Sequence, residues 1–237
     1  MAADTLVIIP AYNEEAALPA VLASLRGRFP AFDIVVVDDG SADRTSQVAH
    51  AGGAAVVTLP FNLGVGGALR TGFRYAVRQG YRRAVQLDAD GQHDAADVDA
   101  VLAPLADGAD LVIGSRFAAG AGEYEVGTGR RSAMRFMQRA VRLLSGKSFT
   151  DTSSGFRAFG PEALDLFARQ YPIDFLSDSV EALLAALASG LTVVEVPVHM
   201  NERTAGVPST RRLKLVYHYV RLLIVMTASA PRRRNAS

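Results

Sequence analysis

The sequence predicts an α/β domain, built on a mostly parallel sheet with helices on both faces. In the first half of the chain, five short apolar segments rich in β-branched residues alternate with segments of helical period. The apolar segments run without polar interruption, as in parallel strands that are buried on both faces. With 237 residues, of which 49% are hydrophobic and 21% charged, the chain can bury one sizeable core. We therefore expect a single domain over residues 1–237.

The strands and helices of the first half are delimited by turn residues. The expected strands are residues 6–9, 34–37, 55–59, 84–87 and 111–113, and the expected helices are residues 14–25, 43–51, 66–78 and 95–105. In sheets of this kind, ligands bind beyond the carboxyl ends of the strands. The polar residues that directly follow each strand are therefore the candidates for a site.

The second half of the chain predicts more helix than strand. We expect a basic helix over 131–144, a turn-rich segment at 151–160, a helix from Pro161, a helix over 177–188 and a strand over 192–198. Residues 213–230 have helical period, but they are too short and too interrupted for a membrane span, which needs about 20 predominantly apolar residues. They fit either a C-terminal helix packed on the domain or a helix that lies in a membrane interface.

The net charge of +1 hides two parts of opposite sign. Residues 1–125 carry 9 Lys and Arg against 16 Asp and Glu, whereas residues 126–237 carry 16 against 8. The acidic part suits a cation and argues against a nucleic-acid binder. The basic part suits phosphate groups or an anionic membrane surface.

Several classes of protein are excluded by what the sequence lacks. There is no cysteine, so disulfides, thiolate catalysis and cysteine zinc sites are ruled out. The Gly-rich segment 62–68 does not fit the dinucleotide fingerprint, because Leu69 stands at the position of the third glycine. A dehydrogenase is therefore not expected. The N-terminus has neither the basic region nor the cleavage site of a signal peptide, so we expect a cytoplasmic location.

A pair of carboxylates follows the strand predicted at 84–87. Asp88 leaves the strand end, and Asp90, two residues on, can turn to the same side. Two hard oxygen ligands of this kind hold Mg or Mn and leave coordination positions for water and for the oxygens of a diphosphate. His93 is either a further ligand or a residue at the start of the next helix.

The ends of the first two predicted strands are also polar. Tyr12 and Glu14 follow the first strand, where an aromatic ring can stack on a base and a carboxylate can accept hydrogen bonds from a base or ribose. Asp38 and Asp39 follow the second strand, and Asp43 beyond them suits a helix cap. Three acidic strand ends at one edge of the sheet predict a site for a cation and a nucleotide.

The order and spacing of several motifs now identify a resemblance. The segments IIPAYNEE, VVVDDGSADRT, NLGVGGALRTG, QLDADGQH, IGSRF, DTSSGFRAF and EVPVHMNER resemble the family 2 glycosyltransferases of GT-A fold, and within them the dolichol- or polyprenyl-phosphate sugar transferases. The resemblance covers about residues 5–210. It implies a nucleotide-sugar-binding half over 1–120 and an acceptor half over 121–210, followed by a C-terminal helix and basic tail over 211–237.

The resemblance also implies roles for individual residues. The nucleotide-sugar would be held by Pro10, Ala11, Tyr12, Glu14, Val37, Asp38, Asp39, Asp88, Ala89, Asp90, Gln92 and Arg203. The metal would be bound by Asp88, Asp90 and Gln92, and the acceptor phosphate by Arg116, Arg130, Arg131 and Ser132. Asp90, Arg116, Arg131 and Arg203 would then act in catalysis.

Departures from the family pattern narrow the expected reaction. Processive synthases carry a QxxRW motif, and this chain has no tryptophan. Members that act on sugar hydroxyls place an acidic base, often in an ED dipeptide, after the metal motif, and no ED occurs here; Asp151 and Asp178 are the remaining base candidates. A phosphate acceptor needs no strong base, because its second pKa is about 6. The expected activity is therefore inverting, metal-dependent transfer of a hexose from a UDP- or GDP-sugar to polyprenyl or dolichyl phosphate.

Other functions and partners stay open at this point. The alternatives are transfer to a soluble hydroxyl acceptor, a non-catalytic nucleotide-sugar-binding module and a nucleotidyltransferase, although the last lacks its Gly-rich basic loop after the first strand. A lipid acceptor implies peripheral contact with the cytoplasmic membrane face or a small membrane-protein partner. Arg135, Arg139 and Arg142 share one face of the basic helix, where they would meet lipid headgroups or water.

Overall fold

The computed structural model describes residues 4–121, 128–172 and 178–201. Within these ranges it describes the side chains of all residues except 128–131, 133 and 178. None of the helices in the described ranges is long and apolar enough to cross a membrane.

A seven-stranded sheet forms the centre of the described fold, in the order β3-β2-β1-β4-β6-β5-β7. β6 runs antiparallel to both of its neighbours, and all other neighbouring strands are parallel. The strands are β1 Thr5–Ala11, β2 Asp33–Asp38, β3 Ala55–Thr58, β4 Arg83–Gln86, β5 Leu111–Ser115, β6 Arg157–Phe159 and β7 Val193–Pro197.

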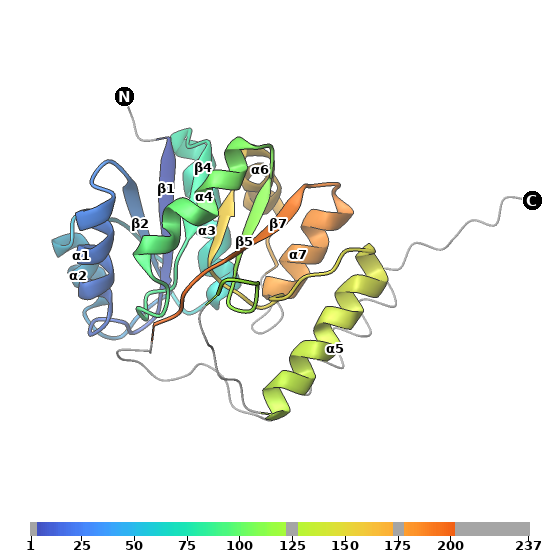
Figure 1. Cartoon of the computed structure of the whole chain (residues 1–237). Coiled ribbons are helices and arrows are strands. Elements are labelled where there is room, and N and C mark those ends of the chain that lie inside the picture. The colour runs from blue at the N-terminus through green and yellow to red at the C-terminus, as the bar shows by residue number, and fades with distance from the viewer. Residues whose placement is uncertain (1–3, 122–127, 173–177, 202–237) are drawn as a thin grey trace, which may run out of the picture.

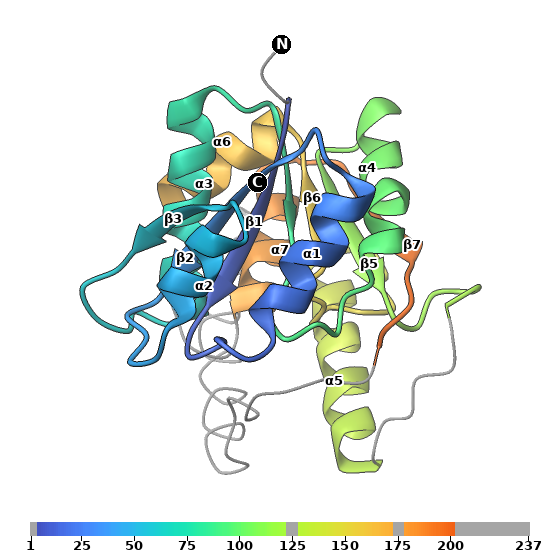
Figure 2. The same cartoon turned by 90° about the vertical axis from the view of Figure 1, so that its left-hand side faces the viewer.

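Helices cover both faces of the sheet (Figures 1 and 2). One face carries α1 Leu18–Arg28, α2 Thr45–Ala51 and α4 Val98–Ala106, the last preceded by the 3₁₀ turn η1 Ala95–Asp97. The other face carries α3 Val65–Gln79, α6 Pro161–Gln170 and α7 Asp178–Ala188. α5 Thr128–Ser145 lies below the sheet in both views and packs Met137 and Val141 into the same core as α3 and α6.

The core follows from the alternation of side chains along the buried strands. In β1, Leu6 and Ile8 point to the α3 side, and Val7 and Ile9 point to the α1 side, all at most 1% exposed. Because both faces are covered, the central strands β1 and β2 are buried along almost their whole length, and the layered arrangement of helices and sheet confirms the predicted α/β class. The strand order reverses direction between β1 and β4, so their carboxyl ends flank the crevice where ligands bind in such sheets.

The structure corrects two expectations about the elements. Residues 151–160 were expected to form turns, but β6 lies within them; a strand of three residues is too short to display a period. The first helix was expected from residue 14, but it begins at Leu18, because the amides of Asn13 and Glu14 donate to Ser41 Oγ and Thr45 Oγ1 instead of joining a helix. The helix expected at 213–230 lies outside the described residues.

At Gly72, α3 lies tightly against the sheet. A Cβ atom there would overlap Cγ2 of Ile8 in β1. We expect Gly72→Ala to lower the free energy of unfolding by about 1–3 kcal/mol, because the added methyl group overpacks the core. The control is Gly27→Ala in α1, where a Cβ meets no atom within 4 Å. This change should raise the free energy of unfolding by up to about 1 kcal/mol. Urea unfolding measures both; equal stability of Gly72→Ala and the parent chain would contradict this packing.

Candidate active site

The loops after β1 and β2 are bound tightly to one another. Asn13 has a φ of 55°, and its side-chain oxygen accepts the amide N–H of Ala42 at 2.8 Å. Asp38 accepts the amide N–H of Ser41 at 2.9 Å and the hydroxyl of Ser46. The carboxyl edge therefore has a fixed shape on this side without any ligand.

Asp39 stabilises the loop that leads into α3 through two hydrogen bonds. Its two carboxylate oxygens accept the amide N–H groups of Leu63 and Gly64 at 2.7 and 2.8 Å. Burial raises the pKa of the Asp39 carboxyl, and these two hydrogen bonds offset only part of that effect. Gly40, at φ +72°, permits the approach, since a Cβ there would lie 2.8 Å from the backbone carbon of Phe61. Each oxygen of Asp39 keeps a lone pair that can accept from a nucleotide base.

The remaining residues of the predicted nucleotide side differ in accessibility. Tyr12 is 48% exposed, so its ring can receive a base. Pro10 and Glu14 are half-buried, and Ala11 is buried at the end of β1. The side chain of Val37 is fully buried and faces Gly72 of α3, which leaves only its backbone to contact a nucleotide.

Asp88 and Asp90 lie at the end of β4, where the strand order reverses. The side chain of Asp88 is 41% exposed, and Asp90 is buried with Oδ1 accepting the amide N–H of Gln92 at 3.0 Å. His93 packs on the ring of Phe156, and its Nδ1 accepts the amide N–H of Asp88 at 3.1 Å. Nε2 of the same ring lies 3.7 Å from Asp88 Oδ2. Both ring nitrogens of His93 thus lie close to Asp88, and Nδ1 is occupied by the backbone amide of that residue.

The backbone at Gly155 lies close to the carboxylate of Asp88. A Cβ at this position would lie 3.1 Å from both carboxylate oxygens of Asp88. Gln86 of β4 pairs with Arg157 of the neighbouring strand β6. Arg157 is fully buried and donates to the carbonyl oxygens of Ser154 and Ser179. Within the described residues, its Nη1 and Oε1 of Gln86 have no hydrogen-bond partner, so one buried donor and one buried acceptor can receive a water or a bound molecule.

The donor set at this edge fits a hard divalent cation. Asp88 and Asp90 supply carboxylate oxygens, and Mg and Mn prefer such ligands while keeping further positions for water and phosphate. Among the described residues there is no group of three or more His, Asp and Glu side chains that could hold a metal by itself. A cation here would therefore take most of its remaining ligands from water or a bound diphosphate. Gln92, the third predicted ligand, is half-buried beside the pair. Its backbone carbonyl accepts the amide N–H of Asn201 at 2.9 Å.

Arg116, at the end of β5, forms a buried ion pair with Asp151. Nε and Nη2 of the arginine donate to Oδ2 and Oδ1 of the carboxylate at 2.6 and 2.8 Å, and Nη2 also reaches Ser153 Oγ at 2.9 Å. Arg116 is 8% exposed and Asp151 is fully buried. Burial alone would raise the pKa of Asp151, but the hydrogen bonds and charge of Arg116 outweigh it and lower the pKa below its usual value.

Glu195 of β7 holds the segment that carries Asp151. Its carboxylate accepts the amide N–H groups of Thr150 and Asp151 at 2.7 and 2.8 Å. A chain of contacts thus runs from β7 through the Asp151 backbone to the guanidinium at the end of β5. The sequence analysis did not identify Glu195, because its partners lie about 45 residues away in the chain. The signal that could have found it is a single glutamate within an otherwise apolar strand.

The other predicted phosphate contacts are placed only in part. Arg130 and Arg131 belong to the first turns of α5, but their side chains lie outside the described part of the structure. The side chain of Asp178 and the whole of Arg203 also lie outside it. Ser132 is exposed on α5. His93 pairs with Met200 in an isolated bridge, so residues 200 and 201 lie beside the segment that directly follows the Asp88–Asp90 pair.

Comparisons with known proteins agree on one family. Residues 6–167 match the model of the family described as Glycosyl transferase family 2. The polyprenol monophosphomannose synthase of Mycolicibacterium smegmatis is 34% identical over 216 residues, which cover 86% of this chain and 79% of that protein. The undecaprenyl-phosphate mannosyltransferase of Micrococcus luteus is 33% identical over 211 residues, which cover 85% of each chain.

A solved structure shares the fold. The glucosyl-3-phosphoglycerate synthase of Mycobacterium tuberculosis, crystallised with Mn²⁺, UDP and phosphoglyceric acid, has a TM-score of 0.71 with this chain. The match covers 95% of this chain and 78% of that one at 21% sequence identity.

The Arg116–Asp151 pair predicts a pH-dependent stability. Asp151→Asn leaves a buried guanidinium without its carboxylate and should cost about 3–5 kcal/mol of unfolding free energy at neutral pH. Because the pKa of Asp151 is lower in the folded chain than its ordinary 3.8, the unfolded state binds more protons between the two values. The contribution of the pair is thus complete above the unfolded pKa and is lost as the pH falls through the folded pKa.

Urea unfolding between neutral and strongly acidic pH measures this effect. The parent chain should lose stability on acidification more steeply than Asp151→Asn. The control is Asp165→Asn, which breaks the exposed pair with Arg169 and should change stability by at most about 0.5 kcal/mol. Parallel pH profiles for the parent chain and Asp151→Asn would contradict the assignment.

Proposed function

The chain belongs to glycosyltransferase family 2 and has the GT-A fold, and from this premise we propose that it transfers a hexose from a UDP- or GDP-linked donor to polyprenyl or dolichyl phosphate. The observation that carries the proposal is the state of Asp151. This carboxylate, a remaining candidate for a general base, is fully buried and held in two hydrogen bonds by Arg116. It is therefore in no position to take a proton from an acceptor hydroxyl.

Four other described carboxylates at this edge have different tasks. Asp38 and Asp39 accept hydrogen bonds from neighbouring loops, and Asp88 and Asp90 form the pair suited to a cation. A hydroxyl acceptor would need a base that these residues do not provide. A phosphate monoester needs none, since it is largely anionic near neutrality, with a second pKa of about 6.

The relatives support the same class of acceptor. Two proteins more than 30% identical to this chain are named for transfer of mannose to prenyl phosphates. A mannose-linked nucleotide is therefore the first donor to test, with other hexoses as comparisons. The lipid acceptor also implies that the protein works at a membrane surface.

The proposed mechanism rests on alignment and charge. Tyr12 and the loop held by Asp39 would receive the nucleoside, and Asp88 and Asp90 would hold a divalent cation against the diphosphate. The cation would supply charge neutralisation for the leaving nucleoside diphosphate. Arg116, held by Asp151, would bind an oxygen of the acceptor phosphate and orient it.

The bond changes balance without a proton transfer to the protein. An oxygen of the acceptor phosphate attacks the anomeric carbon from the face opposite the diphosphate, and the new carbon–oxygen bond forms as the old one breaks. The electron pair of the broken bond leaves with the nucleoside diphosphate. Attack from the opposite face inverts the anomeric configuration.

An acceptor assay tests the proposal. Purified full-length chain with Mn²⁺ and labelled UDP-, GDP- and dTDP-sugars is incubated with polyprenyl phosphate or with soluble hydroxyl acceptors. Label should enter the lipid-phosphate fraction with one of the donors. The proposal fails if label enters only water-soluble products, and a chain that binds nucleotide without any turnover would point to a binding module.

Asp90→Asn tests the cation in the same assay. The variant should lose about 100-fold or more of the transfer rate, because a charged ligand is replaced by a neutral one. Asp99→Asn, an equivalent change on the exposed face of α4, should leave the rate unaltered. Equal rates for Asp90→Asn and the parent chain would refute the metal assignment.

A further inference from the structure

One charged side chain in the centre of the sheet has no part in the proposed mechanism. Arg157 of β6 is fully buried, and its Nε and Nη2 donate to the carbonyl oxygens of Ser154 and Ser179 at 2.9 Å each. Neither of these contacts is with a carboxylate, and Nη1 has no hydrogen-bond partner among the described residues. An apolar side chain of similar volume would fill the same space without desolvating a charge. Stability alone therefore gives no reason for an arginine at this position.

β6 runs between the two strands whose ends carry the charged groups of the site. Asp88 follows β4 and Arg116 follows β5, and β6 is hydrogen-bonded to both strands. Because β6 is antiparallel to its neighbours, the residues before it, and not those after it, lie at the carboxyl edge of β4 and β5. Residues 153–155, here called the β6 entry segment, are therefore placed between Asp88 and Arg116.

The β6 entry segment contacts both of these charged groups. At one end, Ser153 Oγ accepts a hydrogen bond from Nη2 of Arg116 at 2.9 Å. At the other end, a Cβ at Gly155 would lie 3.1 Å from both carboxylate oxygens of Asp88. Gly155 does not have a positive φ, so the glycine is required by the space beside Asp88 and not by the backbone conformation. The segment thus spans from the proposed cation side to the proposed acceptor side.

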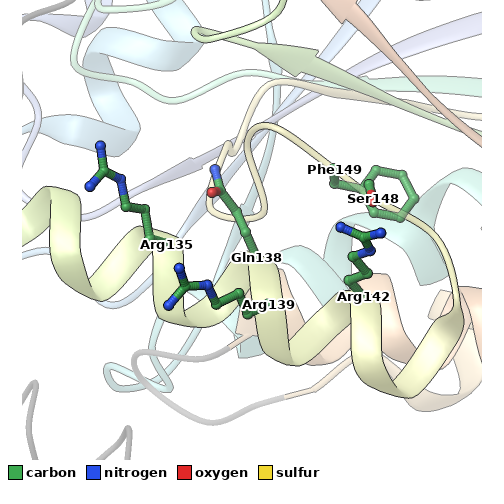
Figure 3. Close-up of a pocket in the computed structure, with 6 residues that line it drawn as sticks. All are labelled: Arg135, Gln138, Arg139, Arg142, Ser148 and Phe149. Carbon is green, nitrogen blue, oxygen red and sulfur yellow. The ribbon is translucent and has the colours of Figure 1, made fainter.

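The chain around the β6 entry segment is held from two directions. Before the segment, Gln138 of α5, drawn in Figure 3, donates from Nε2 to the carbonyl of Thr150 at 2.6 Å. Within the segment, the carbonyl of Ser154 accepts from Arg157, and the same guanidinium reaches the first turn of α7. Since these two contacts use different nitrogens of one planar group, Arg157 fixes the segment relative to both β6 and α7.

We propose that Arg157 is a positioning residue for the transfer reaction, which keeps the β6 entry segment between Asp88 and Arg116 at a fixed separation of the two. This role rests on the proposed function, in which the leaving diphosphate lies at Asp88 and the attacking phosphate at Arg116. The transferred hexose then lies between them, beside the entry segment. A displacement of about 1 Å in such an arrangement can lower the rate about 100-fold. Arg157 itself is buried and touches neither substrate.

Arg157→Met tests this role, because methionine fills much of the same space but donates no hydrogen bond to the entry segment. Transfer to a short-chain prenyl phosphate is measured with Mn²⁺ and the donor sugar that the parent chain uses. The number of functional sites is counted by calorimetric titration with the nucleoside diphosphate and Mn²⁺. The kcat per site should fall by about 10- to 100-fold, while the affinity for the nucleoside diphosphate stays at the parent value.

Phe159→Leu is the matched control for a general loss of stability. Phe159 is a fully buried residue of the same strand and packs on the rings of Phe73 and Phe167. Its truncation should lower the melting temperature by several degrees but leave the kcat per site at the parent value. If Arg157→Met also has a lower melting temperature and the parent kcat per site, Arg157 only stabilises the fold and the proposal is overturned.

Gly155→Ala covers the case in which Arg157→Met does not fold. The added methyl group must displace the carboxylate of Asp88, which is 41% exposed and has room to move. The melting temperature should therefore stay at the parent value, and the affinity for Mn²⁺ alone, measured by electron paramagnetic resonance, should fall about tenfold. Parent values of both the Mn²⁺ affinity and the kcat would show that the entry segment does not act on Asp88, which overturns the proposal.

The choice of acceptor separates this role from the proposed function. If the parent chain transfers sugar only to a soluble hydroxyl acceptor, the proposed function fails, and the kcat per site of Arg157→Met with that acceptor still decides the role of Arg157. If the parent chain uses prenyl phosphate and Arg157→Met does so at the parent kcat per site, only the positioning role fails.

Discussion

The buried ion pair between Arg116 and Asp151 is the constraint on which the second half of the site depends. Desolvating two charges is costly, and the pair offsets that cost only through its two-pronged geometry. That geometry requires the segment after α5 to lie against the end of β5, and Glu195 of β7 keeps it there through the amides of Thr150 and Asp151. The guanidinium is consequently placed before any substrate arrives, so little ordering is left to occur during binding.

The first half of the site uses buried carboxylates in a similar way. Asp38 and Asp39 hold neighbouring loops through backbone amides, and His93 and Gly155 fix the surroundings of Asp88. Acidic groups therefore shape the side that would receive a cation and a nucleotide. Arginines dominate the other side, from Arg116 at the sheet edge to Arg135, Arg139 and Arg142 on α5. The opposite charges of the two parts of the chain thus match the two ends of the proposed reaction, in which a metal-bound diphosphate leaves and an anionic acceptor attacks.

The sequence predicted the main elements and the Asp88–Asp90 pair, because these depend on local pattern. Apolar runs identify strands that are buried on both faces, and a polar residue directly after such a run lies at the carboxyl edge. β6 was not predicted, because three residues show no period and its antiparallel direction depends on tertiary pairing. The partners of Asp39 and Glu195 were not predicted either, since each binds amides more than 20 residues away in the chain. The residue types predicted contacts with a ligand, whereas the structure shows that these carboxylates accept hydrogen bonds from backbone amides of neighbouring segments.

We propose that Glu195 places Arg116 for the acceptor phosphate without touching a substrate. The most direct test is the kcat/KM of Glu195→Gln for prenyl phosphate, measured with saturating donor sugar. Misplacement of the Arg116–Asp151 pair should lower this value by about 10- to 100-fold, while the affinity for the nucleoside diphosphate, which binds on the other side of the site, stays at the parent value. A folded Glu195→Gln variant with the parent kcat/KM would contradict the positioning role of Glu195.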